Sequence, residues 1–521
     1  MRVAYDPPSV NTKKDSPGAE VAAGLPERLA LRVLQFGASA TVLAASALTQ
    51  FDLDRFLIPK DLALHVTAVV AGVLAIRAAS RAIGSFVDWL LLAYLALSAV
   101  SALLATNGWI GFRALAISAS SVLLFWTARG LKDAGLQRPL LNGIAFAVVF
   151  SSVTSLLQTY GLRVVFFSIN RAPGGTLGNR NFVAHVAAFG FPIVFLAALR
   201  AQRMRWPLVG LALVSAALVL TRSRAAWLAS VFMALILCAG VIASERQMWK
   251  RLAAGFLAAL CGAGAALLLP NSLHWRSQNP YLQSMAGIAN YEEGSGRGRL
   301  IQYERSLRMA ASSPILGVGP GNWTVDYPRF VPRGDPSMNP SAPGMTFNPW
   351  PSSDWVAFVS ERGFIGALLM MMVMVTIALR GGSGAEFAAL LATLAAAIVC
   401  GLFDAVLILP LPAFLVWASL GALWRDGEGR SHKPVLLAVI LVSAFGVARS
   451  SAQLTAMEMY ATATSRASLE RAARIDPGSF ALHLRLARSG PRRERCPHAR
   501  AAHALFPNSD GARNLTARCA E

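Results

Sequence analysis

The residues best suited to chemistry lie in a polar stretch, residues 271–363, that separates two blocks of apolar segments. It contains SGRGRLIQYERSL (295–307) and SSPILGVGPGNW (312–323), and it returns to apolar sequence through SSDWVAFVSERGFIG (352–366). Arginine binds phosphate bidentately, and a carboxylate can accept a proton from an attacking hydroxyl. A charged segment, a glycine-rich turn and a return to apolar sequence therefore predict a site outside the membrane that closes against it.

The composition is that of a membrane protein. Of 521 residues, 55% are hydrophobic and 14% are charged, whereas about 25% of the residues of a soluble protein are charged. The formal charge of +21 is spread over short loops, which favours lipid headgroups and phosphate-bearing substrates over nucleic acid. The five cysteines show no metal-ligand spacing, so we expect neither a metal nor a cofactor.

Apolar runs long enough to cross a bilayer as helices predict an all-α, polytopic membrane helix bundle of about thirteen spans. The runs lie at residues 31–49, 62–77, 85–105, 110–128, 140–160, 182–199, 206–221, 225–244, 252–269, 364–380, 385–403, 406–424 and 434–449. Basic residues in alternate turns place the N-terminus in the cytoplasm. An odd number of spans then places the 271–363 loop and the C-terminus on the periplasmic side.

The two ends of the chain differ in character. Residues 1–29 lack an apolar segment directly after their basic residues, so we expect a disordered cytoplasmic tail rather than a cleaved signal peptide. After the membrane domain (30–450), residues 451–521 are polar and resemble one or two tetratricopeptide-type helical hairpins. We expect them to pack against the membrane domain or against a partner protein. Cys496 and Cys519 flank the second hairpin, and we predict that they form a disulfide, because disulfides persist outside the cytoplasm.

Several basic residues fall in turns that the topology places on the outer side, where positive charge opposes insertion. They include Lys60, Arg113, Arg180, Arg222, Arg224, Arg297 and Arg299. Each one alone could extend toward lipid headgroups. As a set, they predict an anion-binding cavity.

Six stretches in this order resemble the bacterial O-antigen ligase and polymerase family. They are LIPKD (57–61), SLLQTYG (155–161), GTLGNRNFVAHVAAF (175–189), LTRSRAAWLA (220–229), RLIQYERSLRMAASSPILGVGPGNW (299–323) and DWVAFVSERGFIG (354–366). The resemblance implies a GT-C-related helical fold in the bacterial inner membrane. It also implies a polyprenyl-diphosphate-linked glycan as donor, and a growing polysaccharide or a lipid as acceptor.

The resemblance assigns roles to particular residues. Arg299 and Arg224, or Arg222 in its place, match the family's arginines, which would hold the diphosphate and stabilise its departure. Arg297, Arg180, Lys60 and Arg113 are further candidates for binding the diphosphate or the glycan. Tyr303 and Glu361 are candidates for orienting the loop.

The chain departs from the family at the general base. Where the family's ligases have a His-Asn pair, this chain has Ser352 and Ser353, followed by Asp354. We predict that Asp354 takes the proton from the acceptor, with a helix cap as the alternative interpretation. The polar stretch has one histidine, His274, which we interpret as an exposed loop residue.

The sequence is compatible with more than one function. The family includes polymerases, lipid ligases and protein O-oligosaccharyltransferases, and the acceptor depends on loop shape. A catalytically inert scaffold would explain the missing histidine. An anion transporter is disfavoured, because few charged residues lie well inside the spans.

Overall fold

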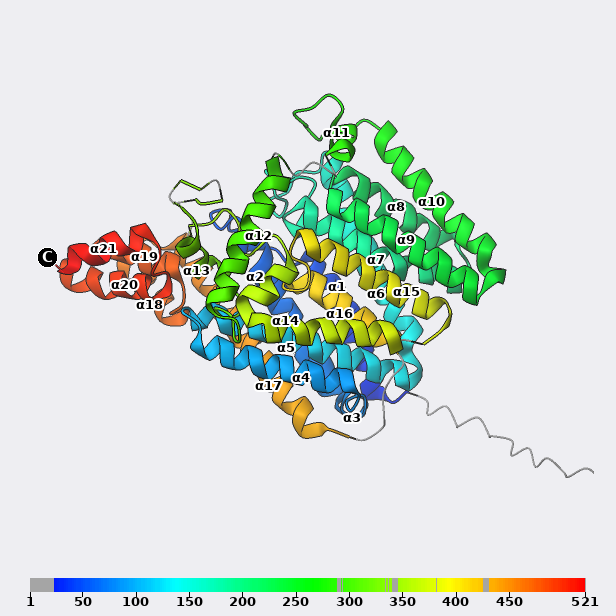
Figure 1. Cartoon of the computed structure of the whole chain (residues 1–521), viewed down its shortest axis with the longest axis horizontal. Helices are drawn as coiled ribbons and strands as arrows, with labels where there is room; N and C mark the ends of the chain where they lie inside the picture. The colour runs from blue at the N-terminus through cyan, green and yellow to red at the C-terminus, as the bar shows by residue number, and fades with distance from the viewer. Residues whose placement is uncertain are drawn as a thin grey trace, which may run out of the picture.

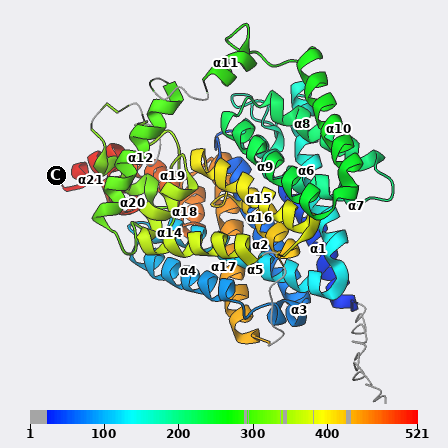
Figure 2. The ribbon, with the colours of Figure 1, turned by 45° about the vertical axis from the view of Figure 1, so that its right-hand side comes forward.

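A computed structural model describes residues 23–287, 292, 294–332, 334–335, 337–339, 345–380, 382–424 and 431–520. Within these ranges the chain is helical and contains no β-strand. The helices form one bundle, with a smaller group of helices at one end (Figures 1 and 2). The predicted all-α class is confirmed.

Each of the thirteen predicted apolar runs coincides with a helix. They are α1 (Leu25–Leu43), α2 (Asp54–Leu74), α4 (Phe86–Leu104), α5 (Gly108–Leu131), α6 (Gln137–Thr159), α7 (Arg180–Arg200), α8 (Arg205–Leu220), α9 (Arg224–Ser244), α10 (Trp249–Leu268), α14 (Asp354–Arg380), α15 (Gly384–Phe403), α16 (Pro410–Leu423) and α17 (Lys433–Thr462). Nine stretches of the described chain are long and apolar enough to cross a membrane, and one of them, Gly108–Thr159, contains both α5 and α6. The chain is therefore a multi-pass membrane protein.

Two boundaries near the N-terminus differ from the sequence prediction. Helix α1 begins at Leu25, inside the predicted tail, whereas residues 1–22 lie outside the described residues. Lys60 lies within α2 rather than in a turn. The helix continues through Pro59 because the Arg55 carbonyl, which a proline at this position cannot bond, accepts the Ser46 amide at 2.8 Å instead.

The polar stretch folds into short helices that return to the bundle. They are α11 (Pro280–Ala286), α12 (Gly294–Ser312), α13 (Trp323–Asp326) and the 3-10 turn at Tyr327–Phe330. Helix α12 packs along α14. In Figure 1, α12 is seen between the bundle and the C-terminal helices.

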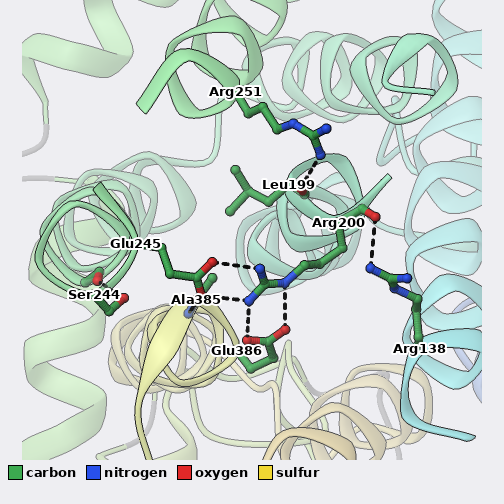
Figure 3. A network of polar contacts seen from close by, with 9 residues as sticks. Arg138, Leu199, Arg200, Ser244, Glu245, Arg251, Ala385 and Glu386 are labelled. Atoms are coloured by element: carbon green, nitrogen blue, oxygen red, sulfur yellow. Dashed lines mark hydrogen bonds and ion pairs between the residues drawn. The ribbon is translucent and has the colours of Figure 1, made fainter. Parts of the chain in front are cut away.

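Three of the spanning helices, α7, α9 and α15, pack against one another. At one end of this unit, Arg200 of α7 lies between two carboxylates (Figure 3). Its guanidinium donates at 2.7 Å to Glu245, just after α9, and at 2.7 Å to Glu386 in α15. This pairing fixes the three helix ends relative to one another.

The C-terminal helices are α18 (Arg466–Ile475), α19 (Phe480–Ala487), α20 (Arg492–Leu505) and α21 (Asp510–Ala520), each packed on the next. Helix α17 extends to Thr462, beyond its predicted end at 449. Asp476 accepts a hydrogen bond from Trp109 Nε1 at 2.7 Å, which attaches this group to the start of α5. Cys496 and Cys519 form a disulfide with their Cα atoms 5.7 Å apart, so that prediction is confirmed.

Candidate functional site

Two predicted arginines meet on one tryptophan ring. The Arg180 guanidinium carbon lies 5.0 Å from the centre of the Trp275 ring, and that of Arg222 lies 4.6 Å from it. Within the described chain neither arginine forms an ion pair with a carboxylate. Two cations held by the electron-rich face of one ring leave their charge available to an anion.

The backbone between α8 and α9 presents the second of these arginines. Arg222 has φ of 58°, in the left-handed region that a residue with a Cβ adopts only under constraint. Its Nε donates to Ser284 Oγ of α11 at 3.0 Å. Burial lowers the pKa of the Arg222 guanidinium. The strained turn thus directs a partly desolvated cation toward α11.

Arg224 is the first residue of α9, two residues further on, and its Nη1 donates to the Gly287 carbonyl just after α11. Both arginines of the TRSR turn therefore contact the same short segment of the polar stretch. We use the name arginine cluster for Arg180, Arg222 and Arg224.

Helix α12 carries the other predicted arginines and joins two parts of the site. Arg297 is exposed, whereas Arg299 is half-buried and lies within electrostatic range of His185 in α7. Tyr303 Oη lies 2.7 Å from the Ser352 carbonyl oxygen and 2.6 Å from that of Leu402. Tyr303 thus connects α12 to the segment before α14 and to the end of α15.

Asp354 is fully buried at the start of α14. Its carboxylate accepts backbone hydrogen bonds from Val406 at 3.0 Å and from Leu407 at 2.9 Å. A Cβ placed on Gly401 would lie 2.8 Å from Asp354 Oδ2. These contacts hold the connection between α15 and α16, which is a structural role beyond the predicted one.

Glu361 joins the glycine-rich turn to a kink in α14. Its carboxylate accepts from the Gly321 amide at 2.9 Å, and its carbonyl accepts from the Gly319 amide at 3.0 Å. The kink lies at Gly363, with φ of 71°, where a Cβ would come within 2.2 Å of the Ile315 carbonyl oxygen. Both segments need glycine here because their backbones touch.

Lys60 and Arg113 make contacts within the bundle. The Lys60 ammonium is buried and donates to the carbonyls of Ala44 and Thr176, the latter at 2.8 Å. Arg113 forms an ion pair of 2.6 Å with Asp61. Since Thr176 lies in the turn before α7, Lys60 supports the segment from which Arg180 projects.

Sequence reasoning missed two polar residues beside the site. Asp404, at the end of α15, is half-buried and accepts a hydrogen bond from Asn181 Nδ2 at 3.1 Å, next to Arg180. His185, one turn further along α7, is buried, and its ring nitrogens have no hydrogen-bond partner among the described residues. The sequence signal for Asp404 is an acidic residue at the end of an apolar run, although the prolines that follow it also allow the segment to be interpreted as a simple helix break.

His274 is exposed, as the sequence predicted. The described residues contain no group of three or more histidine, cysteine or acidic side chains that could hold a metal ion.

Residues 209–371 match the sequence model of a family described as O-antigen ligase. This segment contains Arg222, Arg224, α12 and the start of α14, so the match includes most of the site. It confirms the resemblance to that family and supports glycan transfer in polysaccharide assembly. No curated protein matches the chain.

Proposed function

We propose that this chain, which carries an O-antigen ligase segment, transfers a polyprenyl-diphosphate-linked glycan to an acceptor hydroxyl at the periplasmic face of the bacterial inner membrane. The observation that carries the proposal is the arginine cluster. Arg180 and Arg222 converge on Trp275, and neither has a carboxylate partner in the described part of the chain. A diphosphate would supply the negative charge that these two arginines do not receive from a carboxylate.

The arginines would act on the leaving group. When the acceptor oxygen attacks the anomeric carbon, the bond from that carbon to the diphosphate breaks, and negative charge accumulates on the diphosphate. Fixed guanidinium groups stabilise charge that develops in a transition state. Arg222 and Arg224 are held by α11, so they are oriented before the donor arrives. Arg299 and Arg297, on α12, would extend the positive surface toward the glycan.

Two carboxylates are candidates for taking the acceptor proton. Asp354, the residue predicted from the sequence, has its oxygens turned toward backbone amides and is fully buried. Asp404 is half-buried, is oriented by Asn181 and, like Arg299, lies within electrostatic range of His185. A base must reach its proton directly or through one water, so this geometry favours Asp404 as the group that meets the acceptor. In this arrangement Asp354 would hold the segment that carries Asp404.

Loop orientation would depend on Glu361 and Tyr303. Glu361 attaches the glycine-rich turn to α14, and Tyr303 attaches α12 to the ends of α14 and α15. We propose that these contacts set the distance between the arginines and the two carboxylates. The C-terminal helices would serve as a docking place for other proteins of polysaccharide assembly.

The test is the surface glycan of a deletion strain that is complemented with variants. Wild type should restore it, whereas Arg222→Ala protein, present in the membrane at normal level, should not. Products limited to one repeat would identify a polymerase. Unattached polymer would identify a ligase, and loss of protein glycosylation would identify an oligosaccharyltransferase. A normal glycan pattern in the deletion strain would contradict the proposal and favour an inert scaffold.

A further inference from the structure

A second positively charged site lies at the other end of the bundle. It is a cavity of about 280 Å³ lined by Arg77, Arg81, Ser431 and Lys433. The two arginines lie four residues apart on α3 (Ile76–Arg81) and therefore share one face of it. Lys433 begins α17, whose 30 residues span about 45 Å. The cavity is thus on the opposite face of the bundle from the C-terminal helices.

Contacts between three helices form the wall of the cavity. Ser80 Oγ of α3 lies 3.0 Å from Ser431 Oγ, and the His432 amide donates to the Ser80 carbonyl at 2.9 Å. The His432 ring packs edge-on against Trp89 of α4, with the ring centres 5.6 Å apart. The cavity is therefore formed before any ligand binds.

Among the described residues, no carboxylate pairs with the cations of the cavity. None of Arg77, Arg81 and Lys433 forms an ion pair within the described ranges of the chain. All three residues are exposed and line the cavity. Converging like charges repel one another, so an anion that enters the cavity would bind all three favourably.

Apolar surface continues from the cavity along α4. Phe86 and Trp89 at the start of this helix are each 48% exposed. Tryptophan is enriched where a membrane meets water, which places the cavity at headgroup depth. A ligand that fits both surfaces carries a phosphate at one end and a hydrocarbon chain at the other.

We propose that this cavity binds the phosphate headgroup of an anionic phospholipid in the leaflet opposite the transfer site, with an acyl chain beside Phe86 and Trp89. Basic pockets between membrane helices are known to take such headgroups. Free phosphate shares the headgroup chemistry but cannot use the apolar surface. The site is independent of the proposed transfer reaction.

The test measures lipid binding by the full-length protein in detergent. Native mass spectrometry reports retention of phosphatidylglycerol, with phosphatidylcholine as the zwitterionic control and inorganic phosphate as the competitor. The test variant is Arg77→Gln/Arg81→Gln. The matched control is Arg203→Gln/Arg205→Gln, which removes two exposed arginines from another turn of the same predicted face.

We expect wild type and the matched control to retain phosphatidylglycerol in preference to phosphatidylcholine. The test variant should bind phosphatidylglycerol roughly thirtyfold more weakly, because each charge near a membrane surface contributes about 1 kcal/mol. If that variant does not fold, Lys433→Gln alone should weaken binding about fivefold. Equal binding by test and control variants would overturn the proposal. Complete displacement by inorganic phosphate would identify a free-anion site and would overturn the lipid assignment.

Discussion

An arginine lies at each end of α7, and the two differ in whether carboxylates pair with them. At its last residue, Arg200 donates to Glu245 and to Glu386 and is satisfied within the protein (Figure 3). At its first residue, Arg180 lies over Trp275 beside Arg222, and no carboxylate of the described chain pairs with it. The helix has 21 residues, so the two environments are about 30 Å apart.

This difference separates a structural cation from one available to a ligand. Two carboxylates from neighbouring helices neutralise the charge of Arg200. Its backbone carbonyl is also hydrogen-bonded, because Arg138 donates to it at 3.0 Å. At the other end, an aromatic ring and a hydroxyl hold the guanidinium groups without neutralising them. An anion can therefore bind at one end of α7 but not at the other.

Changing the proposed proton acceptor should have the largest effect on transfer. Asp404→Asn should lower turnover by about 10²–10⁴-fold, the usual loss of a general base. Asp354→Asn should lose part of its backbone contacts and show reduced thermal stability as well as reduced turnover. Transfer rates and melting temperatures of both purified proteins distinguish the roles. If Asp354→Asn were fully stable and inactive while Asp404→Asn were active, the roles would be exchanged.

Substitutions in the arginine cluster should have the second-largest effect on transfer. Arg222→Ala is expected to lower turnover by about 10²–10³-fold, as for loss of one preorganised donor to a developing charge. Arg222→Lys should recover little, because a lysine lacks the planar fork. The assay compares these variants with Arg203→Ala, an exposed arginine near the other end of α7. Equal activity of the Arg222 and Arg203 variants would remove the distinction between the two ends.

For Arg200 we expect a loss of stability and little change in transfer. Arg200→Ala leaves Glu245 and Glu386 without their shared partner, and we expect a loss of about 2 kcal/mol of stability. This is below the 3–5 kcal/mol for breaking a fully buried pair, because 24% of the Arg200 side chain is exposed. Denaturation in detergent measures it. Transfer per folded molecule should change far less than in Arg222→Ala, and an equal loss would contradict a structural role.

The same pairing predicts how stability depends on pH. The hydrogen bond from Arg200 lowers the pKa of Glu245 in the folded protein. Its contribution is therefore present above the unfolded pKa of about 4.3 and is lost as the pH falls through the lower folded value. Melting temperatures below pH 5 should decline more steeply in wild type than in Arg200→Ala. Parallel curves would show that the pair contributes no stability.

The disulfide should have the smallest effect on transfer. Cys496→Ser/Cys519→Ser removes a link between residues separated by 23 positions, worth about 3 kcal/mol in the chain-entropy model. We expect faster proteolysis of α20 and α21 and an unchanged transfer rate, since no residue of the arginine cluster contacts this hairpin in the described structure. A large loss of transfer would mean that these helices take part in the site.

The fold was predictable because hydrophobic runs of membrane helices dominate the sequence. Even the short α8 and α16 stood out as apolar segments. Helix ends were less predictable, since local contacts decide them. The amide of Ser46 lets α2 continue past Pro59, and α17 extends thirteen residues beyond its predicted end at 449 to Thr462, where it meets the C-terminal helices.

The types of residue at the site were predictable from the sequence, but the groups that each of them contacts were not. Outward-facing arginines were visible as exceptions to the charge rule, whereas the sequence does not show which of them meet a carboxylate. Arg113 meets Asp61 and Lys60 meets two carbonyls, so these two cations support the bundle. Trp275, which gathers Arg180 and Arg222, comes from a loop without periodicity. Its place depends on tertiary packing.

The most direct test is the affinity of the purified protein for a polyprenyl-diphosphate-linked glycan. Wild type is compared with Arg180→Ala/Arg222→Ala and with Arg203→Ala/Arg205→Ala, which removes the same charge near the other end of α7. The account predicts that the first pair of substitutions abolishes donor binding while the second leaves it intact. Equal affinity in all three proteins would contradict the claim that the arginine cluster holds the diphosphate.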